Sequence, residues 1–324
     1  MNKIKLVNNC SKILLSYKNK HTKFFLYFYY MVVNNIKNYQ NFKIFITVFL
    51  LWFSIQFGKP IEDSIAFVLI ISIGIIHGAN DLLILSLKKM KNNRFVINLF
   101  IYLCIVSFCV IFYILNPFLA ILLFIFISSY HFGEEHLSEK MITNRYFESF
   151  YYIVYGLLIF SMLFYEALFE VNTIMLELTK TIFSEFFVKY TFIFSLISFL
   201  LMNTFLLWKE KIDAKVFLKE GFSLGLLFLV FKTSSLILSF AIYFIFWHSI
   251  PSIINQILFI SGDISKSSIL FYVKKAFLFW LISIVALFVL YQFIPEVTLL
   301  STIVFVILFS VTAPHIWVMY KMKN

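Results

Sequence analysis

Long apolar runs dominate this sequence, and they constrain its fold more than any other feature. A helix needs about 20 apolar residues to cross the hydrocarbon core of a bilayer, and such runs follow one another from residue 43 to the C-terminus. Hydrophobic residues make up 62% of the chain and charged residues only 13%, whereas a soluble domain carries about 25% charge. Water cannot accommodate this much apolar surface. The sequence therefore predicts an all-α, polytopic helical bundle that is integral to a membrane.

The apolar runs predict ten membrane spans, and eight or nine remain possible because two runs are short and two are divided only by Asn116-Pro117. Together they form one predicted transmembrane domain, residues 43–324, with no sign of an inverted repeat. The predicted spans are 43–58, 64–87, 95–115, 117–133, 147–166, 189–208, 217–231, 236–260, 276–294 and 297–320.

The basic residues predict the orientation of the chain. A net charge of +11 would suit nucleic acid, but the lysines lie in short loops between apolar runs, as in membrane proteins. We therefore expect no nucleic-acid partner. With a cytoplasmic N-terminus and alternating spans, Lys59, Lys180, Lys189 and Lys232 alone fall outside. The positive-inside rule thus favours a cell (inner) membrane protein with both termini in the cytoplasm.

Two segments outside the spans are predicted to lie at the membrane surface. Residues 1–42 are rich in Lys and Asn and carry an aromatic patch at 24–33, which is too short to cross a bilayer. We interpret this basic N-terminal segment as an interfacial amphipathic element held by anionic lipid. The outer loop 166–188 mixes glutamates with apolar residues and is expected to hold a short surface helix.

The histidines are the strongest functional signal. An ionisable side chain in hydrocarbon is costly unless it has a partner, so intramembrane histidines are functional candidates by default, although a helix-to-helix hydrogen bond explains any single one. In the predicted topology all but one fall between the membrane midplane and its inner face, as a single metal centre requires. The histidines are His21, in the N-terminal segment, and His77, His131, His136, His248 and His315.

The second predicted span contains the motif GIIHGANDLLIL. His77 and Asp81 are four residues apart and would share a helix face. A carboxylate in that position would accept the second imidazole N–H and fix the tautomer of a metal-bound histidine. The alternative is a buried His–Asp hydrogen bond without a metal.

The fourth predicted span ends in SSYHFGEEHL. His131 and His136 are five residues apart and do not align on an ideal helix. We expect Gly133 to end or distort the helix so that both imidazoles point inward. The alternative is a solvated helix end, which accounts for Glu134 and Glu135 but not for His131.

Proline follows or precedes a histidine in two later spans. In FWHSIPS, Pro251 should kink the helix just after His248, where a polar stripe follows. In TAPHIW, Pro314 precedes His315, which is either a ligand or an end residue that reaches toward the membrane surface.

The types of side chain point to an iron oxygenase. Neutral imidazole binds iron, zinc and copper, but Cys and Met are absent from the cluster, which disfavours copper, and HExxH is absent, which disfavours a zinc hydrolase. Fe(II) with an open coordination position would bind dioxygen. A centre within lipid is reached by apolar substrates, and Tyr130, Phe132 and Trp247 are predicted to line a site for a long conjugated hydrocarbon.

The motifs HGANDLLIL, SSYHFGEEH, FWHSIPS and the final APH, in this order and spacing, resemble the Brp/Blh family. Its members are integral-membrane beta-carotene 15,15'-dioxygenases that cleave beta-carotene at the central double bond to give retinal. The resemblance runs from about residue 60 to the C-terminus. It implies a non-haem Fe(II) cofactor, dioxygen as co-substrate, and iron ligands at His77, His131 and His248.

The chain departs from the family pattern at one position. Many members carry a second histidine four residues after the one that matches His248, where this chain has Ser252. His136 is the candidate fourth ligand, with His315 or water as alternatives. Asp81 is expected to contribute to catalysis by orienting His77.

Three other functions remain open from the sequence. A diverged or inactive family member is one, including one acting on another apolar substrate. A haem electron carrier is the second, with His77 and His248 as facing axial ligands. The third is a non-enzymatic transporter in which His and Asp relay protons.

Overall fold

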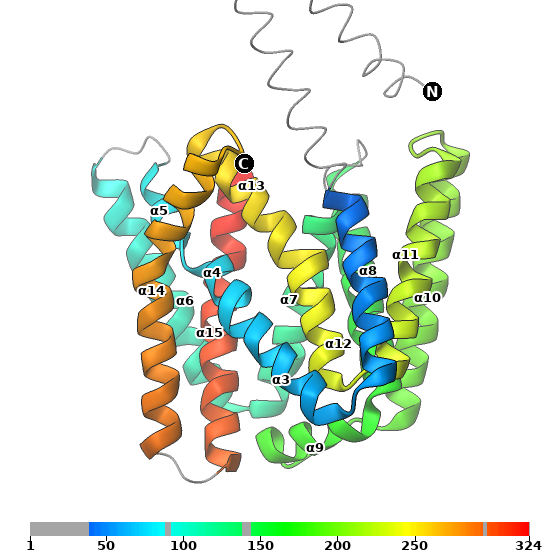
Figure 1. Ribbon diagram of the computed structural model, residues 1–324, viewed down its shortest axis with the longest axis horizontal. Helices are drawn as coiled ribbons and strands as arrows, with labels where there is room; N and C mark the ends of the chain where they lie inside the picture. The colour runs from blue at the N-terminus through cyan, green and yellow to red at the C-terminus, as the bar shows by residue number, and fades with distance from the viewer. Residues whose placement is uncertain (1–38, 88–91, 138–143, 294–296, 324) are drawn as a thin grey trace, which may run out of the picture.

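The structure is a computed structural model that describes residues 39–323, except 88–91, 138–143 and 294–296. Every regular element in the described residues is a helix (Figure 1). Two elements, η1 and η3, are π-helical. The elements are a helix over residues 39–56, α3 (Lys59–Leu69), η1 (Ile70–Gly74), α4 (Ile75–Gly78), α5 (Asp81–Leu87), α6 (Asn92–Leu115), α7 (Pro117–Leu137), α8 (Arg145–Glu166), α9 (Leu168–Thr179), α10 (Glu185–Trp208), α11 (Ala214–Thr233), α12 (Leu236–Ile242), η3 (Tyr243–Ser249), α13 (Ile250–Ser261), α14 (Lys266–Phe293) and α15 (Val297–Lys323).

The predicted polytopic bundle is confirmed. In the described part of the chain, 8 helical segments are long and apolar enough to cross a membrane. They are Lys59–Leu87, Phe95–Leu115, Pro117–Leu137, Arg145–Glu166, Glu185–Trp208, Leu236–Ser261, Lys266–Phe293 and Ile303–Lys323.

The predicted spans 43–58 and 217–231 are helical, but neither is among these segments. Helix 39–56 begins with polar residues, and α11 carries three lysines and Glu220. Both run along the height of the bundle beside the crossing helices (Figure 1).

The predicted surface elements have different outcomes. The short helix expected in the loop 166–188 exists as α9, which lies across one end of the bundle (Figure 1). Most of the N-terminal segment 1–42 lies outside the described residues. Its last residues, 39–42, begin the first described helix.

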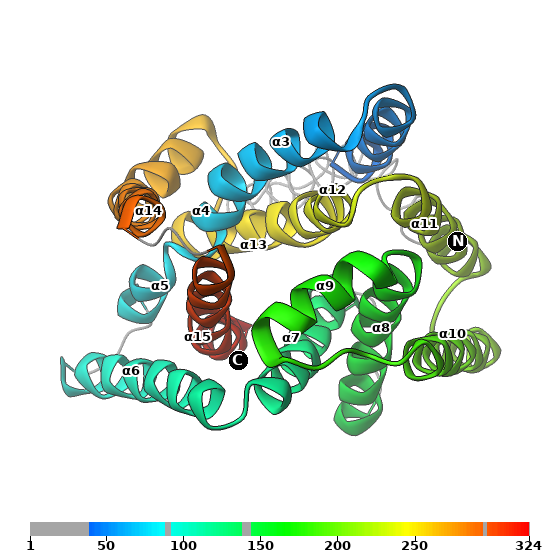
Figure 2. The ribbon, with the colours of Figure 1, turned by 90° about the horizontal axis from the view of Figure 1, so that it is seen from below.

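Two of the crossing segments are interrupted near the middle of the bundle. In Lys59–Leu87 the α-helix gives way to η1, resumes as α4 and breaks again at Ala79 and Asn80 before α5. In Leu236–Ser261 the helix widens into η3 before α13. Seen from below, these two segments lie side by side, and α15 lies between α4 and α7, while η3 contacts α7 directly (Figure 2). Interrupted helices at membrane depth are characteristic of segments that line a functional interior.

Two glycines bring α7 and α8 into direct backbone contact. A methyl group on Gly133 would lie 2.0 Å from the carbonyl oxygen of Tyr152, and one on Gly156 would lie 2.0 Å from that of Ser129. Small residues at a crossing permit this close approach. The expectation that Gly133 ends or distorts the helix is therefore wrong, because α7 continues to Leu137. Gly133 instead fixes the position of α7 against α8.

Candidate metal centre

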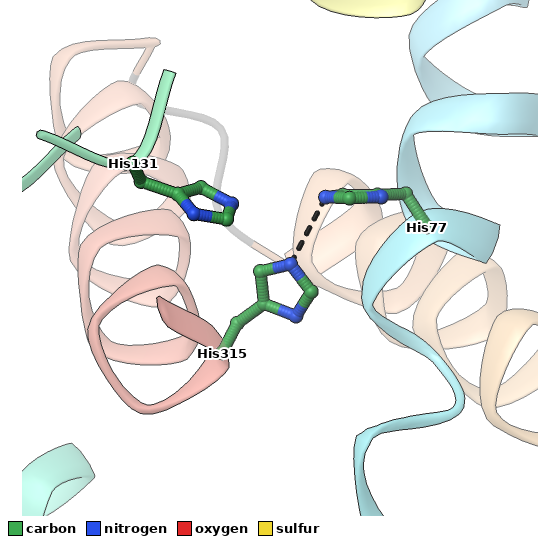
Figure 3. Close-up of side chains that lie close together, drawn as sticks. All are labelled: His77, His131 and His315. Carbon is green, nitrogen blue, oxygen red and sulfur yellow. Dashed lines mark hydrogen bonds between the residues drawn. The ribbon is translucent and has the colours of Figure 1, made fainter. Parts of the chain in front are cut away.

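Four buried imidazoles gather where the interrupted segments meet α7 and α15. They belong to His77 at the end of α4, His131 in α7, His248 in η3 and His315 in α15. Each is at most 4% exposed. Figure 3 shows the rings of His77, His131 and His315 turned toward one another from separate helices. Residues far apart in the sequence thus form one cluster.

The ring distances define a compact site. The His77 ring centroid lies 4.5 Å from that of His315 and 5.0 Å from that of His248. The His131 centroid lies 4.7 Å from that of His248 and 5.4 Å from that of His315. Ligand nitrogens of His77, His131 and His315 all lie within 4.8 Å of one another. His248 adjoins these three as the fourth imidazole.

Asp81 contacts His315 rather than His77. Nδ1 of His315 donates to Oδ1 of Asp81 over 2.7 Å, and both side chains are buried. The Nε2 atoms of His315 and His77 are 2.9 Å apart (Figure 3). Since Asp81 holds the Nδ1 proton of His315, the Nε2 lone pair of His315 faces the cluster. This is the carboxylate–histidine arrangement that orients metal ligands.

The break after α4 is closed by a polar network from two other helices. The backbone carbonyl of His77 accepts a hydrogen bond from Nε2 of Gln256 at 3.1 Å. Tyr272 donates its hydroxyl to Oε1 of Gln256 at 2.8 Å, and Asn80 donates to the carbonyl of Tyr272 at 3.1 Å. A carbonyl freed by a helix end at membrane depth needs such a donor. The network therefore fixes the backbone that carries His77.

The π-helix η3 positions His248. Pro251 has no N–H for the helical ladder, and the turn before it widens. Tyr39 donates its hydroxyl to the backbone carbonyl of Phe246. The indole of Trp247 donates to Thr47 at 3.1 Å. Helix 39–56 thus supports the widened turn from the side.

The structure leaves His136 outside the cluster. Its Nε2 lies 2.8 Å from a carboxylate oxygen of Glu220, and its ring stacks on Tyr155 with centroids 4.6 Å apart. A separation of five residues turns two side chains by about 140° around a continuous α-helix. His131 and His136 therefore face different neighbours, and His315 is the additional histidine that reaches the cluster.

Of the aromatic residues predicted to line a substrate site, Phe132 lies beside the histidine cluster, whereas Tyr130 and Trp247 make other contacts. The Phe132 ring lies 4.6 Å from that of His248. Tyr130 instead donates to Glu134 at 3.4 Å, and Trp247 contacts Thr47 and lies under the ammonium of Lys43.

Sequence reasoning missed Phe244. Its ring stacks 5.7 Å from that of His248 and lies 6.2 Å from that of His77. The signal was present, because Phe244 precedes His248 by four residues and so shares its helix face.

The donor set fits a bound transition metal. Among the described residues, no hydrogen-bond partner exists for Nδ1 of His77, for either nitrogen of His131, or for Nδ1 of His248. Buried polar atoms ordinarily have a partner. With metal–nitrogen bonds of about 2.1 Å, ligands on opposite sides of an ion are about 4.2 Å apart, which is close to the 4.8 Å within which one nitrogen each of His77, His131 and His315 lies.

The glutamates that follow His131 are not at a solvated helix end. Glu134 is 7% exposed and Glu135 is 6% exposed. The ammonium of Lys323 lies 3.6 Å from Oε2 of Glu134 and 3.3 Å from Oε2 of Glu135. Both carboxylates are therefore internal groups beside the histidine cluster.

Comparison with known proteins identifies the family of the chain. The sequence model of the family described as beta-carotene 15,15'-dioxygenase matches residues 68–323, which include all of the clustered histidines and Asp81. No curated protein and no solved structure matches the chain. Since the match covers most of the sequence, the chain belongs to the beta-carotene 15,15'-dioxygenase family.

Proposed function

We propose that this membrane protein is an iron-dependent dioxygenase that cleaves beta-carotene at its central double bond and releases retinal. The convergence of four buried histidines in a bundle of this family carries the proposal. Family membership supports carotene oxidation as the reaction class.

Fe(II) would be held by His77, His131 and His315, with His248 completing the set. When bound, iron supplies the activation of dioxygen that no protein side chain provides. Asp81 accepts a hydrogen bond from the Nδ1–H of His315 and thereby orients that imidazole, with its Nε2 lone pair directed into the site.

The protein's own contribution to the reaction is to position an apolar polyene and to exclude water. Phe132 and Phe244 form apolar walls against the ring of His248. A polyene that enters from the lipid would pack against these rings with one double bond beside the imidazoles. Holding a substrate in such a reactive geometry accounts for much of the rate enhancement of enzymes.

The crowding of the imidazoles argues against a haem carrier. A haem places its porphyrin plane between two axial histidines. Here the Nε2 atoms of His77 and His315 are 2.9 Å apart, and His131 and His248 fill the adjoining space. A macrocycle would have to displace most of the cluster.

We further propose that the protein lies in the cell inner membrane and that both ends of the described chain are on its cytoplasmic side. The start of the helix over residues 39–56 and the end of α15 lie at the same end of the bundle (Figure 1). The lysine-rich loop between α10 and α11 lies at that end as well. The positive-inside rule supports this orientation.

Expression in a bacterial host that accumulates beta-carotene tests the function. We expect the wild-type chain to bleach the cells and to yield retinal on chromatography. His77→Ala should abolish retinal formation while the protein still inserts into the membrane, because it removes one imidazole of the cluster. Unchanged retinal in that variant, or wild-type cells that stay coloured, would contradict the proposal.

His136→Gln is the matched control. Glutamine keeps a hydrogen-bond donor for Glu220, and the position lies outside the cluster. We expect this variant to retain iron and activity, whereas His315→Ala should lose both. The opposite pattern would make His136 the fourth ligand. A Soret band from the purified protein would instead indicate haem.

A further inference from the structure

We propose that Lys323, with Glu134, Glu135 and Asn255, forms a clamp that sets the positions of the helices carrying three of the clustered histidines. The inference deepens the proposed function, since it assumes that the histidines bind a metal ion. Lys323 is a positioning residue in this proposal and does not touch the ion.

The clamp is charged, and its two carboxylates are buried while its ammonium comes from the exposed end of α15. Glu134 and Glu135 occupy the last turn of α7 and are both buried. A buried carboxylate needs a partner, because burial removes its hydration. Lys323, near the end of α15, lies within 4 Å of both carboxylates and is 21% exposed at its side chain. One ammonium thus joins α7 to α15.

A third helix enters through Asn255. Its amide nitrogen donates to Oε1 of Glu135 over 2.7 Å, which ties α13 to the same carboxylate. Tyr130, one turn earlier on α7, donates to Oε1 of Glu134 at 3.4 Å. The clamp therefore connects the ends of α7 and α15 with the middle of α13.

These are the helices on which the histidines depend. His131 precedes Glu135 by one turn of α7, and η3, which bears His248, continues into α13, where Asn255 lies about two turns after His248. His315 precedes Lys323 by about two turns of α15, which is about 12 Å along the axis. A shift at the clamp would move all three imidazoles relative to one another.

Metal binding is sensitive to such shifts. Ligand distances in a metal site must stay within about 0.2 Å of their proper values. The clamp also carries two carboxylates for one ammonium, so its net negative charge favours a nearby cation. Loss of Lys323 would make the clamp more negative, which by itself favours the cation, so weaker metal binding in its absence would come from the shifted ligands. On this ground we expect loss of Lys323 to weaken metal binding more than it weakens the fold.

Cobalt(II) binding to the full-length protein in lipid nanodiscs tests the clamp, because cobalt replaces iron at histidine sites and its visible absorption spectrum reports ligand geometry. We expect Lys323→Met to raise the Co(II) dissociation constant about tenfold and to change the spectrum. Lys323→Arg keeps the charge and should restore both. Wild-type affinity and spectrum in Lys323→Met would overturn the proposal.

Lys321→Met is the matched control. Lys321 lies two residues away on α15 but donates to Asn98 of α6 over 2.7 Å, away from the clamp. The affinity of the Lys321→Met variant for Co(II) should equal that of the wild type. If Lys323→Met fails to insert, Glu135→Gln serves instead, since it keeps Lys323 beside Glu134 and an acceptor for Asn255. We expect Glu135→Gln to raise the Co(II) dissociation constant by less than the roughly tenfold rise expected for Lys323→Met. An unchanged dissociation constant in Glu135→Gln would overturn the clamp.

The outcomes separate the clamp from the function. If the wild type binds Co(II) and Lys323→Met binds it equally well, the clamp alone is wrong. If the wild type binds no Co(II), the metal centre and the clamp fail together. If the clamp variants weaken metal binding but the wild type makes no retinal, the proposed reaction is wrong and the clamp stands.

Discussion

At Asp81, one carboxylate determines which nitrogen of His315 faces the other imidazoles. Asp81 accepts a hydrogen bond from the Nδ1–H of His315, so only Nε2 of that ring is left to bind a metal ion. The His77–Asp81 spacing indicated a buried His–Asp pair but named the wrong histidine, because it assumed a continuous helix. The break at Ala79 and Asn80 turns Asp81 toward α15. Sequence spacing cannot reveal a contact that depends on such a break.

Asp81→Asn should therefore weaken metal binding without removing a ligand. The amide can donate to Nδ1 of His315 and so stabilise the tautomer whose Nε2 carries the proton. Loss of a partner of this kind reduces metal affinity by about 10–100-fold. Iron content after dialysis against a weak chelator measures the effect. Asp263→Asn is the control and should retain iron, because Asp263 lies in the loop before α14, where it accepts hydrogen bonds from Ser265 and Ser268. Equal iron retention in both variants would count against the role of Asp81.

At the scale of the element, the sequence predicted the helices better than their interruptions. The length of the apolar runs and Asn116-Pro117 located α6 and α7, and Pro251 indicated a disturbed helix next to His248. The π-turns of η1 and η3 were not predictable, because they depend on packing between segments distant in the chain: a methyl group on Gly74 would lie only 3.1 Å from the Phe244 ring. The burial of Glu134 and Glu135 was equally hidden, since Lys323 comes from the other end of the domain.

The α7–α8 crossing gives a prediction for a whole element. Gly133→Ala or Gly156→Ala places a methyl group 2.0 Å from a backbone oxygen of the opposite helix, so the helices must separate and His131 must move. Overpacking of this kind costs about 1–3 kcal/mol or more. The midpoint temperature of thermal unfolding of the purified protein should fall, and so should its iron content.

Gly221→Ala and Gly225→Ala are the controls for the crossing. Both glycines lie in α11 with nothing within 4 Å of an added methyl group. Alanine in a helix is favoured over glycine by about 0.5–1 kcal/mol, so these variants should unfold at the same temperature as the wild type or slightly higher. A wild-type midpoint in Gly133→Ala would mean that the crossing is looser than the structure has it.

At the scale of the molecule, composition was sufficient for the membrane bundle but not for the arrangement of its helices. Apolar length predicts a crossing segment, because hydrocarbon selects for it. It does not predict neighbours, because every lipid-facing side is apolar. The histidines provided the missing information, since imidazoles from separate helices at similar depth indicated one meeting point. Their actual partners still depended on helix rotation, which placed His315 in the cluster and His136 beside Glu220.

A ligand set drawn from four segments makes metal binding a property of the whole fold. The unfolded chain does not hold His77, His131, His248 and His315 together, so an ion that binds only the native state stabilises it by about 2.7 kcal/mol at 100 times its dissociation constant. We expect iron or cobalt to raise the thermal midpoint of the purified protein by several degrees, and a chelator to reverse the rise. His131→Ala should abolish the shift, because it removes an imidazole both of whose nitrogens lack a described partner. An equal shift in that variant would place the ion on the protein surface, where it could not serve the buried cluster.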